Sequence, residues 1–309
     1  NGNTDVVNLL LDKNVYIDVQ NAGGASALIV ASKNGHTDIV TALLDKDAHV
    51  DLQTTDGITA LMIAAMGGHE DIVNTLLEKG ADVNRLNENK VTALMVASLE
   101  GHISVVNKLL AKNAKTGLQA IDETTALYMA AQNGHTEIVE ALLAKDAPTD
   151  LKAINQTTAL YMASQNGHTD TVKALLTKDV AIDLIDKNEA SALIMAALFG
   201  HTEIVEALLN KGAKIDQKAK NGFTALILAA QGGHTATVET LLAKGAQINL
   251  QNDDGVTPLM WAALHGHGDV VKTLLAKGAD ISLKSVSEKT ALDIAREPEI
   301  IELLETAAN

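Results

Sequence analysis

A Gly-His pair recurs through this chain at a fixed interval of 33 residues. Because no insertion or deletion interrupts the interval, the pattern indicates one small structural unit stacked many times. The complete units span 21–53, 54–86, 87–119, 120–152, 153–185, 186–218, 219–251 and 252–284. We therefore expect residues 1–309 to form a single repeat domain, with a partial first repeat over 1–20 and a capping repeat over 285–309.

Each unit carries the signals of two short helices joined by a turn. A Ser or Thr, such as Thr59, precedes an Ala-rich run and is a natural N-cap for the first helix. The Gly of each Gly-His pair ends that helix, because a left-handed backbone is easiest for Gly. The second helix has apolar residues such as Ile39, Val40 and Leu43 on one face. Residue types that tolerate the left-handed conformation are expected to end it, at Asp47, Gly80, Asn113, Asp146, Asp179, Gly212, Gly245 and Gly278.

The two ends of the chain depart from this pattern. NGNTDVVNLLLDKN matches the second half of a unit and has no first helix before it, so we infer that the sequence begins inside a longer array. SEKTALDIAREPEIIELLETAAN keeps the framework but has Glu297-Pro298 in place of Gly-His. Since Pro is tolerated in the first turn of a helix, Pro298 is expected to begin the last helix of a terminal cap.

Composition excludes several classes of function. With 47% hydrophobic but only 2% aromatic residues, the core must consist of Leu, Ile, Val, Met and Ala. The absence of cysteine excludes disulfides, cysteine metal sites and thiol nucleophiles. A net charge of -15 opposes binding to nucleic acid or to an anionic membrane. No apolar run is long enough to span a bilayer, so we expect a soluble, cytoplasmic monomer without membrane insertion.

The second unit reads TTDGITALMIAAMGGHEDIVNTLLEKGADVNRL. Its turn, Thr-Ala-Leu helix start, paired Ala, Gly-His, Ile-Val, Leu-Leu and Gly-Ala resemble the ankyrin repeat, and the resemblance covers nearly the whole chain. It implies an all-α ankyrin repeat solenoid, built from helix-turn-helix-loop units with short β-turn fingers, that binds proteins on its concave face.

The central turns depart from the family pattern. Gly24, Gly57, Gly222 and Gly255 occupy the turn glycine, but Lys90, Glu123, Gln156 and Glu189 replace it in the four middle units. A non-Gly residue at positive φ is strained, although the Asn or Asp before it could adopt that conformation instead. The middle fingers are therefore expected to differ in shape or to have drifted with a slightly rearranged turn.

The recurrent histidines do not predict a metal site. Equivalent atoms in neighbouring repeats should lie roughly 8–10 Å apart, whereas zinc ligands must each lie about 2 Å from the ion. We expect each imidazole to bond backbone between the helices and to pack on the next repeat. His265 and His267 could share a ligand, but no third partner is evident. No phosphate loop, nucleophile elbow or metal-helix motif is present either, so we expect no enzyme activity and no cofactor.

Candidate partner-binding residues follow from the resemblance, which places the partner site on the turns and on the residues before each Gly-His. The only two phenylalanines, Phe199 and Phe223, are expected to neighbour each other on the concave face as binding anchors, or else to be core. Tyr128 and Tyr161 are expected either to pack or to form a semi-exposed platform, and Trp261 to pack. The remaining candidates are Leu198, Ile185, Ile154, Ile121, Glu123 and Glu189.

These features favour a non-catalytic protein-protein interaction scaffold whose partner is a protein or peptide of basic character, since the array is acidic. One alternative is a structural spacer or spring, in which the length of the stack matters more than any patch. Another is a targeting or regulatory module of a larger protein whose catalytic domain lies outside this sequence. An engineered array also resembles the chain, but the variation of framework positions (ALIVA, ALMIA, ALYMA) favours a natural sequence.

Overall fold

The protein consists of paired short helices in two compact units. The computed structural model describes residues 2–13 and 15–308, and it divides into unit 1, Asn1–Ile154, and unit 2, Asn155–Asn309. The described residues form helices and turns, with a single isolated antiparallel bridge between Ile185 and Ser191 and no strand. The predicted all-α class is confirmed.

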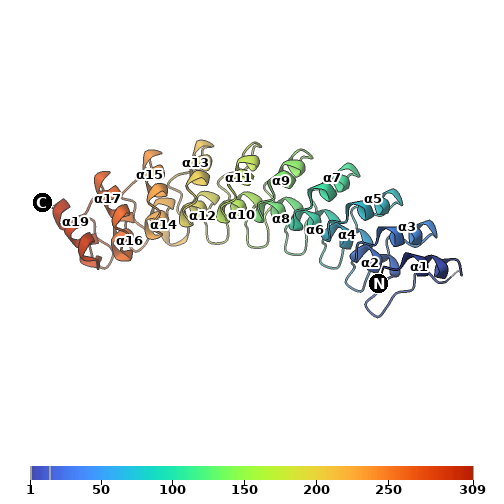
Figure 1. Ribbon diagram of the computed structural model, residues 1–309. Helices are drawn as coiled ribbons and strands as arrows, with labels where there is room; N and C mark the ends of the chain where they lie inside the picture. Colours follow the sequence, from blue (N-terminus) through green and yellow to red (C-terminus); the bar gives the residue numbers. More distant parts are fainter. Residues whose placement is uncertain (1, 14, 309) are drawn as a thin grey trace. The chain divides into compact units, whose positions relative to one another are not determined.

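Unit 1 arranges its helices in two rows (Figure 1). The first helices of the repeats pack on one another in chain order: α2 (Ala27–Lys33), α4 (Ala60–Met66), α6 (Ala93–Glu100) and α8 (Ala126–Gln132). The second helices do the same: α1 (Thr4–Leu11), α3 (Thr37–Asp45), α5 (Glu70–Glu78), α7 (Ile103–Ala111) and α9 (Thr136–Leu143). The described part of the partial first repeat contributes α1 alone, as the sequence predicts.

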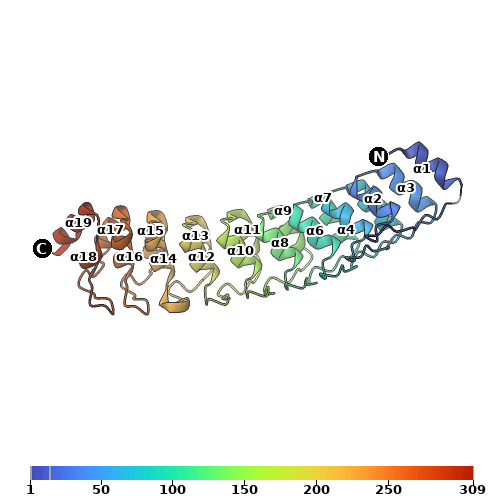
Figure 2. The same ribbon diagram turned by 90° about the horizontal axis from the view of Figure 1, so that it is seen from below.

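Unit 2 repeats this arrangement (Figure 2). Its first helices are α10 (Ala159–Gln165), α12 (Ala192–Leu198), α14 (Ala225–Gln231), α16 (Pro258–His265) and α18 (Ala291–Ile294). Its second helices are α11 (Thr169–Leu175), α13 (Thr202–Asn210), α15 (Thr235–Ala243), α17 (Gly268–Ala276) and α19 (Pro298–Ala308), and a short 3-10 turn, η1 (Lys220–Gly222), precedes α14. The last helix begins at Pro298, as predicted.

The helix ends follow the expected local chemistry. In each complete repeat the Ser or Thr cap accepts a hydrogen bond from the third backbone N–H of the first helix, as Thr59 Oγ1 does from Met62 N at 3.2 Å. The Gly of each Gly-His pair has positive φ, for example 83° at Gly101. Alanines such as Ala64 and Ala229 are fully buried, so the short helices can approach closely and share one core.

One predicted helix end is wrong. Seven of the eight residues expected in the left-handed region lie there, but Asp179 does not. The following residue is Val180, whereas the other complete repeats place Ala at that position, as at Ala147 and Ala213. Those alanines are buried and their backbone N–H groups donate back into the preceding helix, whereas Val180 N donates to Lys178 O. The backbone bond that follows the second helix in the other repeats is therefore replaced here, and α11 ends early, at Leu175.

The fingers that connect successive repeats share one hydrogen-bond register. Within unit 1, Glu88 N donates to Asp56 O, Ile121 N to Asn89 O and Ile154 N to Asp122 O, at 3.0 to 3.1 Å. In unit 2, Lys187 N donates to Asn155 O at 3.3 Å and Lys220 N to Asn188 O at 2.9 Å. Each bond joins residues 32 apart, so every finger is fixed to the next by its backbone.

The middle fingers are not differently shaped, contrary to one sequence expectation. Lys90, Glu123, Gln156 and Glu189 themselves adopt positive φ, at 57°, 64°, 67° and 61°, and the preceding Asn or Asp does not take over that role. The turn is retained because the bonds between fingers continue on both sides of it. The consequence is local backbone strain at these positions, which a glycine would relieve.

Candidate functional site

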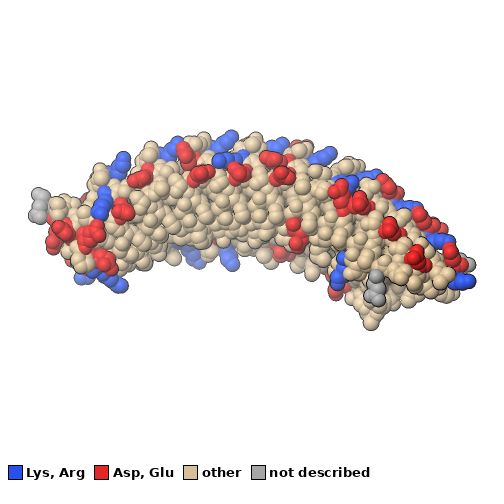
Figure 3. Space-filling model, viewed as in Figure 1, with Lys and Arg blue, Asp and Glu red and all other residues tan. Residues whose placement is uncertain are grey.

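The fingers and the outward sides of the first helices form one continuous face in each unit, which we call the finger face. Figure 3 shows that charged side chains gather over the second helices, whereas the surface over α10, α12 and α14 carries few of them. The candidate residues of the sequence all lie on the fingers or first helices. Their burial decides which of them a partner could touch.

The recurrent histidines hold neighbouring repeats together. His102 Nε2 lies 3.0 Å from Met66 O, and the same contact joins His234 to Leu198 O at 3.0 Å. Since a carbonyl can only accept, Nε2–H is the donor. The ring packs on glycine: a Cβ added at Gly200 would lie 2.5 Å from His234 Nδ1. The histidine therefore bonds backbone as expected, but it packs on the preceding repeat and not on the next one.

The two phenylalanines do not pair with each other. Phe199 is 48% exposed and stacks on His201, with ring centroids 6.2 Å apart. Phe223 is half-buried and packs against Trp261 at 5.8 Å. The expected Phe199–Phe223 neighbourhood is wrong because each ring finds a partner elsewhere: Phe199 within its own repeat, Phe223 on the first helix of the following one.

Phe223 instead begins a row of rings that sequence reasoning missed, which we call the aromatic row. Trp261 stacks on His265 with centroids 5.4 Å apart and an interplanar angle of 11°, and His265 stacks on His267 at 6.1 Å. Trp261 is half-buried between Phe223 and His265, and its Nε1–H is buried without a hydrogen-bond partner. One sequence feature could have predicted this row: Trp261 and His265 are four residues apart, which places both on one side of α16.

The tyrosines are not a semi-exposed platform. Tyr128 is 6% exposed and Tyr161 is 5% exposed. Both occupy the third position of a first helix, which faces the core and is filled by Ile or Met in the other complete repeats, such as Met95. The Tyr161 hydroxyl does not need water, because it donates to Asp186 Oδ2 at 3.1 Å and Asp186 is itself buried.

The remaining candidates lie on the finger face with very different exposures. Ile121 is 57% and Ile154 is 71% exposed, on adjacent fingers of unit 1. Glu123 is exposed beside Ile121. In unit 2, Glu189 is exposed, while Ile185 and Leu198 are half-buried.

Outside the finger face, a second ladder joins the loops that follow the second helices. An Asp or Asn accepts from a backbone N–H of the next repeat, as Asn84 Oδ1 does from Lys115 N at 2.8 Å and Asp183 Oδ1 from Lys214 N at 3.0 Å. At the corresponding position Gly117 has no side chain to accept, and the residue opposite is Pro148, which has no N–H to donate. This loop contact is the one place in unit 1 where the ladder is broken between described repeats.

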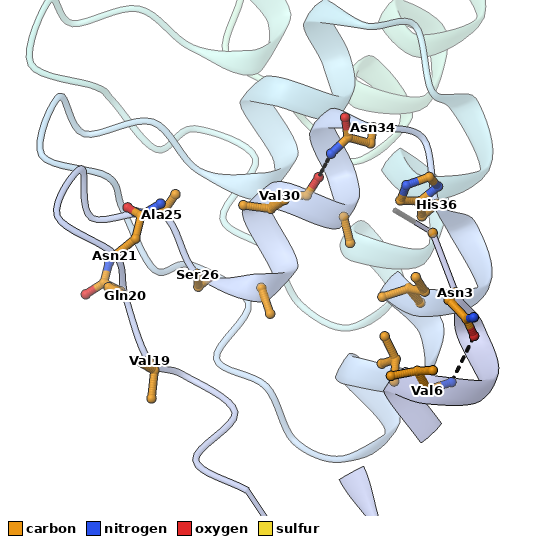
Figure 4. Close-up of a pocket in the computed structure, with 15 residues that line it drawn as sticks. Asn3, Val6, Val19, Gln20, Asn21, Ala25, Ser26, Val30, Asn34 and His36 are labelled. Carbon is orange, nitrogen blue, oxygen red and sulfur yellow. Dashed lines mark hydrogen bonds between the residues drawn. The ribbon is translucent and has the colours of Figure 1, made fainter. Parts of the chain in front are cut away.

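A groove of about 570 Å³ opens at the beginning of unit 1. Figure 4 shows Val6 of α1, Val30 of α2 and the segment at Val19 around it. All three valines are exposed, because among the described residues α4 packs on one side of α2 and no first helix packs on the other. The groove was not among the sequence candidates, and nothing in the structure shows what would cover it.

The carboxyl and amino groups with shifted pKa values lie in the last complete repeat and the capping repeat. The pKa of Glu299 is lowered chiefly by its hydrogen bond to Lys272, whose own pKa is raised by the same contact. Hydrogen bonds from Ser282 and Thr290 lower the pKa of Asp280 and Asp293. Within the described part of the chain, no group of three or more His, Cys, Asp or Glu side chains is arranged to hold a metal ion. His267 Nε2 is already bonded to Gln231 O, at 2.9 Å.

Comparison with known proteins agrees with the repeat geometry. A family model described as ankyrin repeats (3 copies) matches residues 1–87, 46–120, 94–186, 127–219, 165–252, 193–285 and 237–306. The chain belongs to the ankyrin repeat family. The crystal structure of the human ASB11 ankyrin repeat domain is similar to it, with 26% sequence identity and a TM-score of 0.65, over 70% of this chain and 98% of that chain. A comparison with curated proteins finds no match.

The family membership and the repeat solenoid predicted from sequence are thereby confirmed. Ankyrin repeats are generally protein-protein interaction modules, and the fold is typically non-catalytic. Among the described residues, no helix combines the length and the apolar character that crossing a membrane requires.

Proposed function

We propose that this ankyrin array is a monomeric protein-binding scaffold with no chemistry of its own, and that a protein or peptide partner binds its finger face. The aromatic row of unit 2 carries the proposal. Half-exposed aromatic rings supply large contact area at low entropic cost and dominate many interfaces. In a chain with 2% aromatic residues, Phe223 and Trp261 contact each other and Trp261 stacks on the exposed His265, which is a concentration of rings that packing alone does not require.

Phe199 extends this candidate surface on the same unit. Its ring is half exposed, and the adjacent Leu198 is half-buried. A half-exposed aromatic residue contributes less to folding than a buried one, so its binding role can be separated from a structural one. A substitution of Phe223 tests binding less directly, because the packing of its ring on Trp261 also stabilises the fold.

Charge supports a basic partner. The chain carries a net charge of -15, and Glu123 and Glu189 are exposed on the fingers. Complementary charge of this kind mainly accelerates association and makes it dependent on salt. Reversing both glutamates to Lys should therefore slow association more than it speeds dissociation.

Partner capture with the full chain, followed by mass spectrometry, tests the proposed face. Partners that bind the wild type and the control Glu206→Lys, on the second helix α13, should bind Phe199→Ala more weakly by about 2 kcal/mol. The only tryptophan, Trp261, should change its emission when such a partner binds. An unaltered affinity of both Phe199→Ala and Phe223→Ala would remove the proposed surface and favour the spacer alternative. Sedimentation velocity tests the monomeric state.

A further inference from the structure

A second place on the finger face has the shape of a side-chain pocket. A cavity of about 340 Å³ lies between two fingers of unit 1, lined by Asn89, Val91, Ala120, Ile121, Asp122 and Met129. Its apolar walls come from both fingers and from α8, and the fingers are fixed to each other by the Ile121 N–Asn89 O hydrogen bond of 3.0 Å. The cavity is therefore preformed by the backbone ladder.

A carboxylate stands at the rim of this cavity. Asp122 is exposed, and its Oδ1 accepts from Thr124 Oγ1 at 2.6 Å and from Thr124 N at 3.2 Å. These bonds fix the orientation of the carboxylate, and Oδ2 has no hydrogen bond within the described structure. The next residue is Glu123, also exposed, and neither acid forms an ion pair with Lys90 on the adjacent fingertip.

The geometry points to a pocket for the lysine or arginine side chain of a basic partner. This inference rests on the proposed protein-binding function and specifies the partner's chemistry at one position. Lysine and arginine combine an apolar stem with a cationic end. The stem would lie on Val91, Ile121 and Met129, and the cation would reach the Asp122 carboxylate. A wholly apolar side chain would leave that carboxylate without a partner at a partly dehydrated rim, which is unfavourable.

The neighbouring finger provides the variant that separates charge from structure. Asn155 occupies the position equivalent to Asp122, and its Oδ1 accepts the same two bonds, from Thr157 Oγ1 at 2.5 Å and from Thr157 N at 3.3 Å. Asp122→Asn should therefore preserve the finger and remove only the charge. Asp56→Asn is the matched control, because Asp56 lies at the equivalent position of another finger of unit 1, which has Thr55 where this pocket has Ile121.

The experiment uses the full chain with 13C-labelled Ile and Met methyl groups. It is titrated with millimolar Ac-Gly-Gly-Arg-Gly-Gly-NH2 and with the peptide in which neutral citrulline replaces arginine. The arginine peptide should shift the methyl signals of Ile121 and Met129, with an affinity about fivefold above that of the citrulline peptide. Asp122→Asn should bring the arginine peptide down to the citrulline level, Asp56→Asn should not, and Lys90→Gln should strengthen binding.

The inference would be overturned by equal binding of the two peptides, by an unchanged arginine response in Asp122→Asn, or by shifts spread evenly over the methyl groups of all fingers. The absence of any response to the arginine peptide would overturn it as well. None of these outcomes affects the Trp261 emission test of partner binding in unit 2, so failure of the pocket and failure of the proposed function are distinguishable.

Discussion

Restoring the broken loop ladder of unit 1 should couple two substitutions in neighbouring repeats. Gly117→Asp supplies the missing acceptor and Pro148→Lys supplies the missing backbone N–H. Both replacements copy residues found at the equivalent positions, as in the Asp183–Lys214 bond of 3.0 Å. Gly117 and Pro148 are exposed, so neither change disturbs the core. The double variant should therefore be more stable than the sum of the two single variants predicts.

The magnitude follows from the structure. A net hydrogen bond contributes about 0.5–1.5 kcal/mol, and we expect about 1 kcal/mol at this exposed site. Gly117→Asp alone gains no donor, and its Cβ would lie 3.3 Å from Pro148 Cγ, which is crowded. The entropy changes that Gly and Pro substitutions cause in the unfolded chain occur in the single and double variants alike. They cancel in the double-mutant cycle, which compares the double variant with the sum of the two single variants. The coupling free energy therefore reports the new hydrogen bond and the relief of crowding.

Urea unfolding of the wild type, the two single variants and the double variant measures the coupling free energy. The unfolding curves are fitted with a nearest-neighbour scheme, because a repeat array need not unfold in one step. The reverse cycle, Asn84→Gly with Lys115→Pro, converts the intact bond of 2.8 Å into the Gly-Pro pair. Its double variant loses that bond only once, so the two single losses should exceed the double loss by about 1 kcal/mol. A coupling below about 0.3 kcal/mol in both cycles would refute the ladder as a stabilising element.

Three further predictions concern single positions. Each of Ser32→Ala, Ser98→Ala and Ser164→Ala should raise the free energy of unfolding in urea by about 0.5–1 kcal/mol. These hydroxyls are buried without a hydrogen-bond partner, and the other complete repeats have Ala at this position. A loss of stability would contradict this reason. Gln156→Gly and Glu189→Gly should each gain about 1 kcal/mol by relieving positive φ, whereas Gly57→Ala should lose stability, since its Cβ would lie 2.8 Å from Glu88 N. The pKa of Glu299 is lowered by Lys272, so this pair stabilises the docking of α19 above the usual carboxyl range and loses that contribution as the pH falls through the lowered pKa. Lys272→Met should return the pKa of Glu299 toward its ordinary value in an NMR titration, and an unmoved pKa would contradict the assigned cause.

The helix ends were predictable from the sequence because each repeat carries its own capping residues and glycines. The caps at residues such as Thr59 and the left-handed glycines such as Gly101 depend on a few neighbouring residues, and they were predicted correctly. The prediction for Asp179 failed because it ignored the next residue, Val180, which stands where the other complete repeats have Ala. Comparing the residue at the Val180 position in all complete repeats would have revealed this difference.

The candidate site was less predictable, because exposure depends on the neighbouring repeat. Tyr161 looked amphipathic on its own, yet Asp186 of the following repeat lies close enough to accept its hydroxyl hydrogen bond. Phe199 and Phe223 are the only phenylalanines, but ring partners are set by the spacing between fingers and helices, which the sequence does not state. The side-chain pocket at Asp122 likewise needs two fingers, so neither repeat shows it alone.

In two cases a residue that departs from the repeat pattern lies against a residue of the next repeat that also departs from it or accepts its hydrogen bond. Tyr161 is paired with Asp186, 25 positions later, and Gly117 with Pro148, 31 positions later. A repeat is therefore not interchangeable with its neighbours, even though the helices and fingers share one register. Placing residues 120–152 after a repeat with an intact Asp or Asn would set Pro148 against an acceptor that has no donor. The order of the repeats, and not only their number, is part of what stabilises this array.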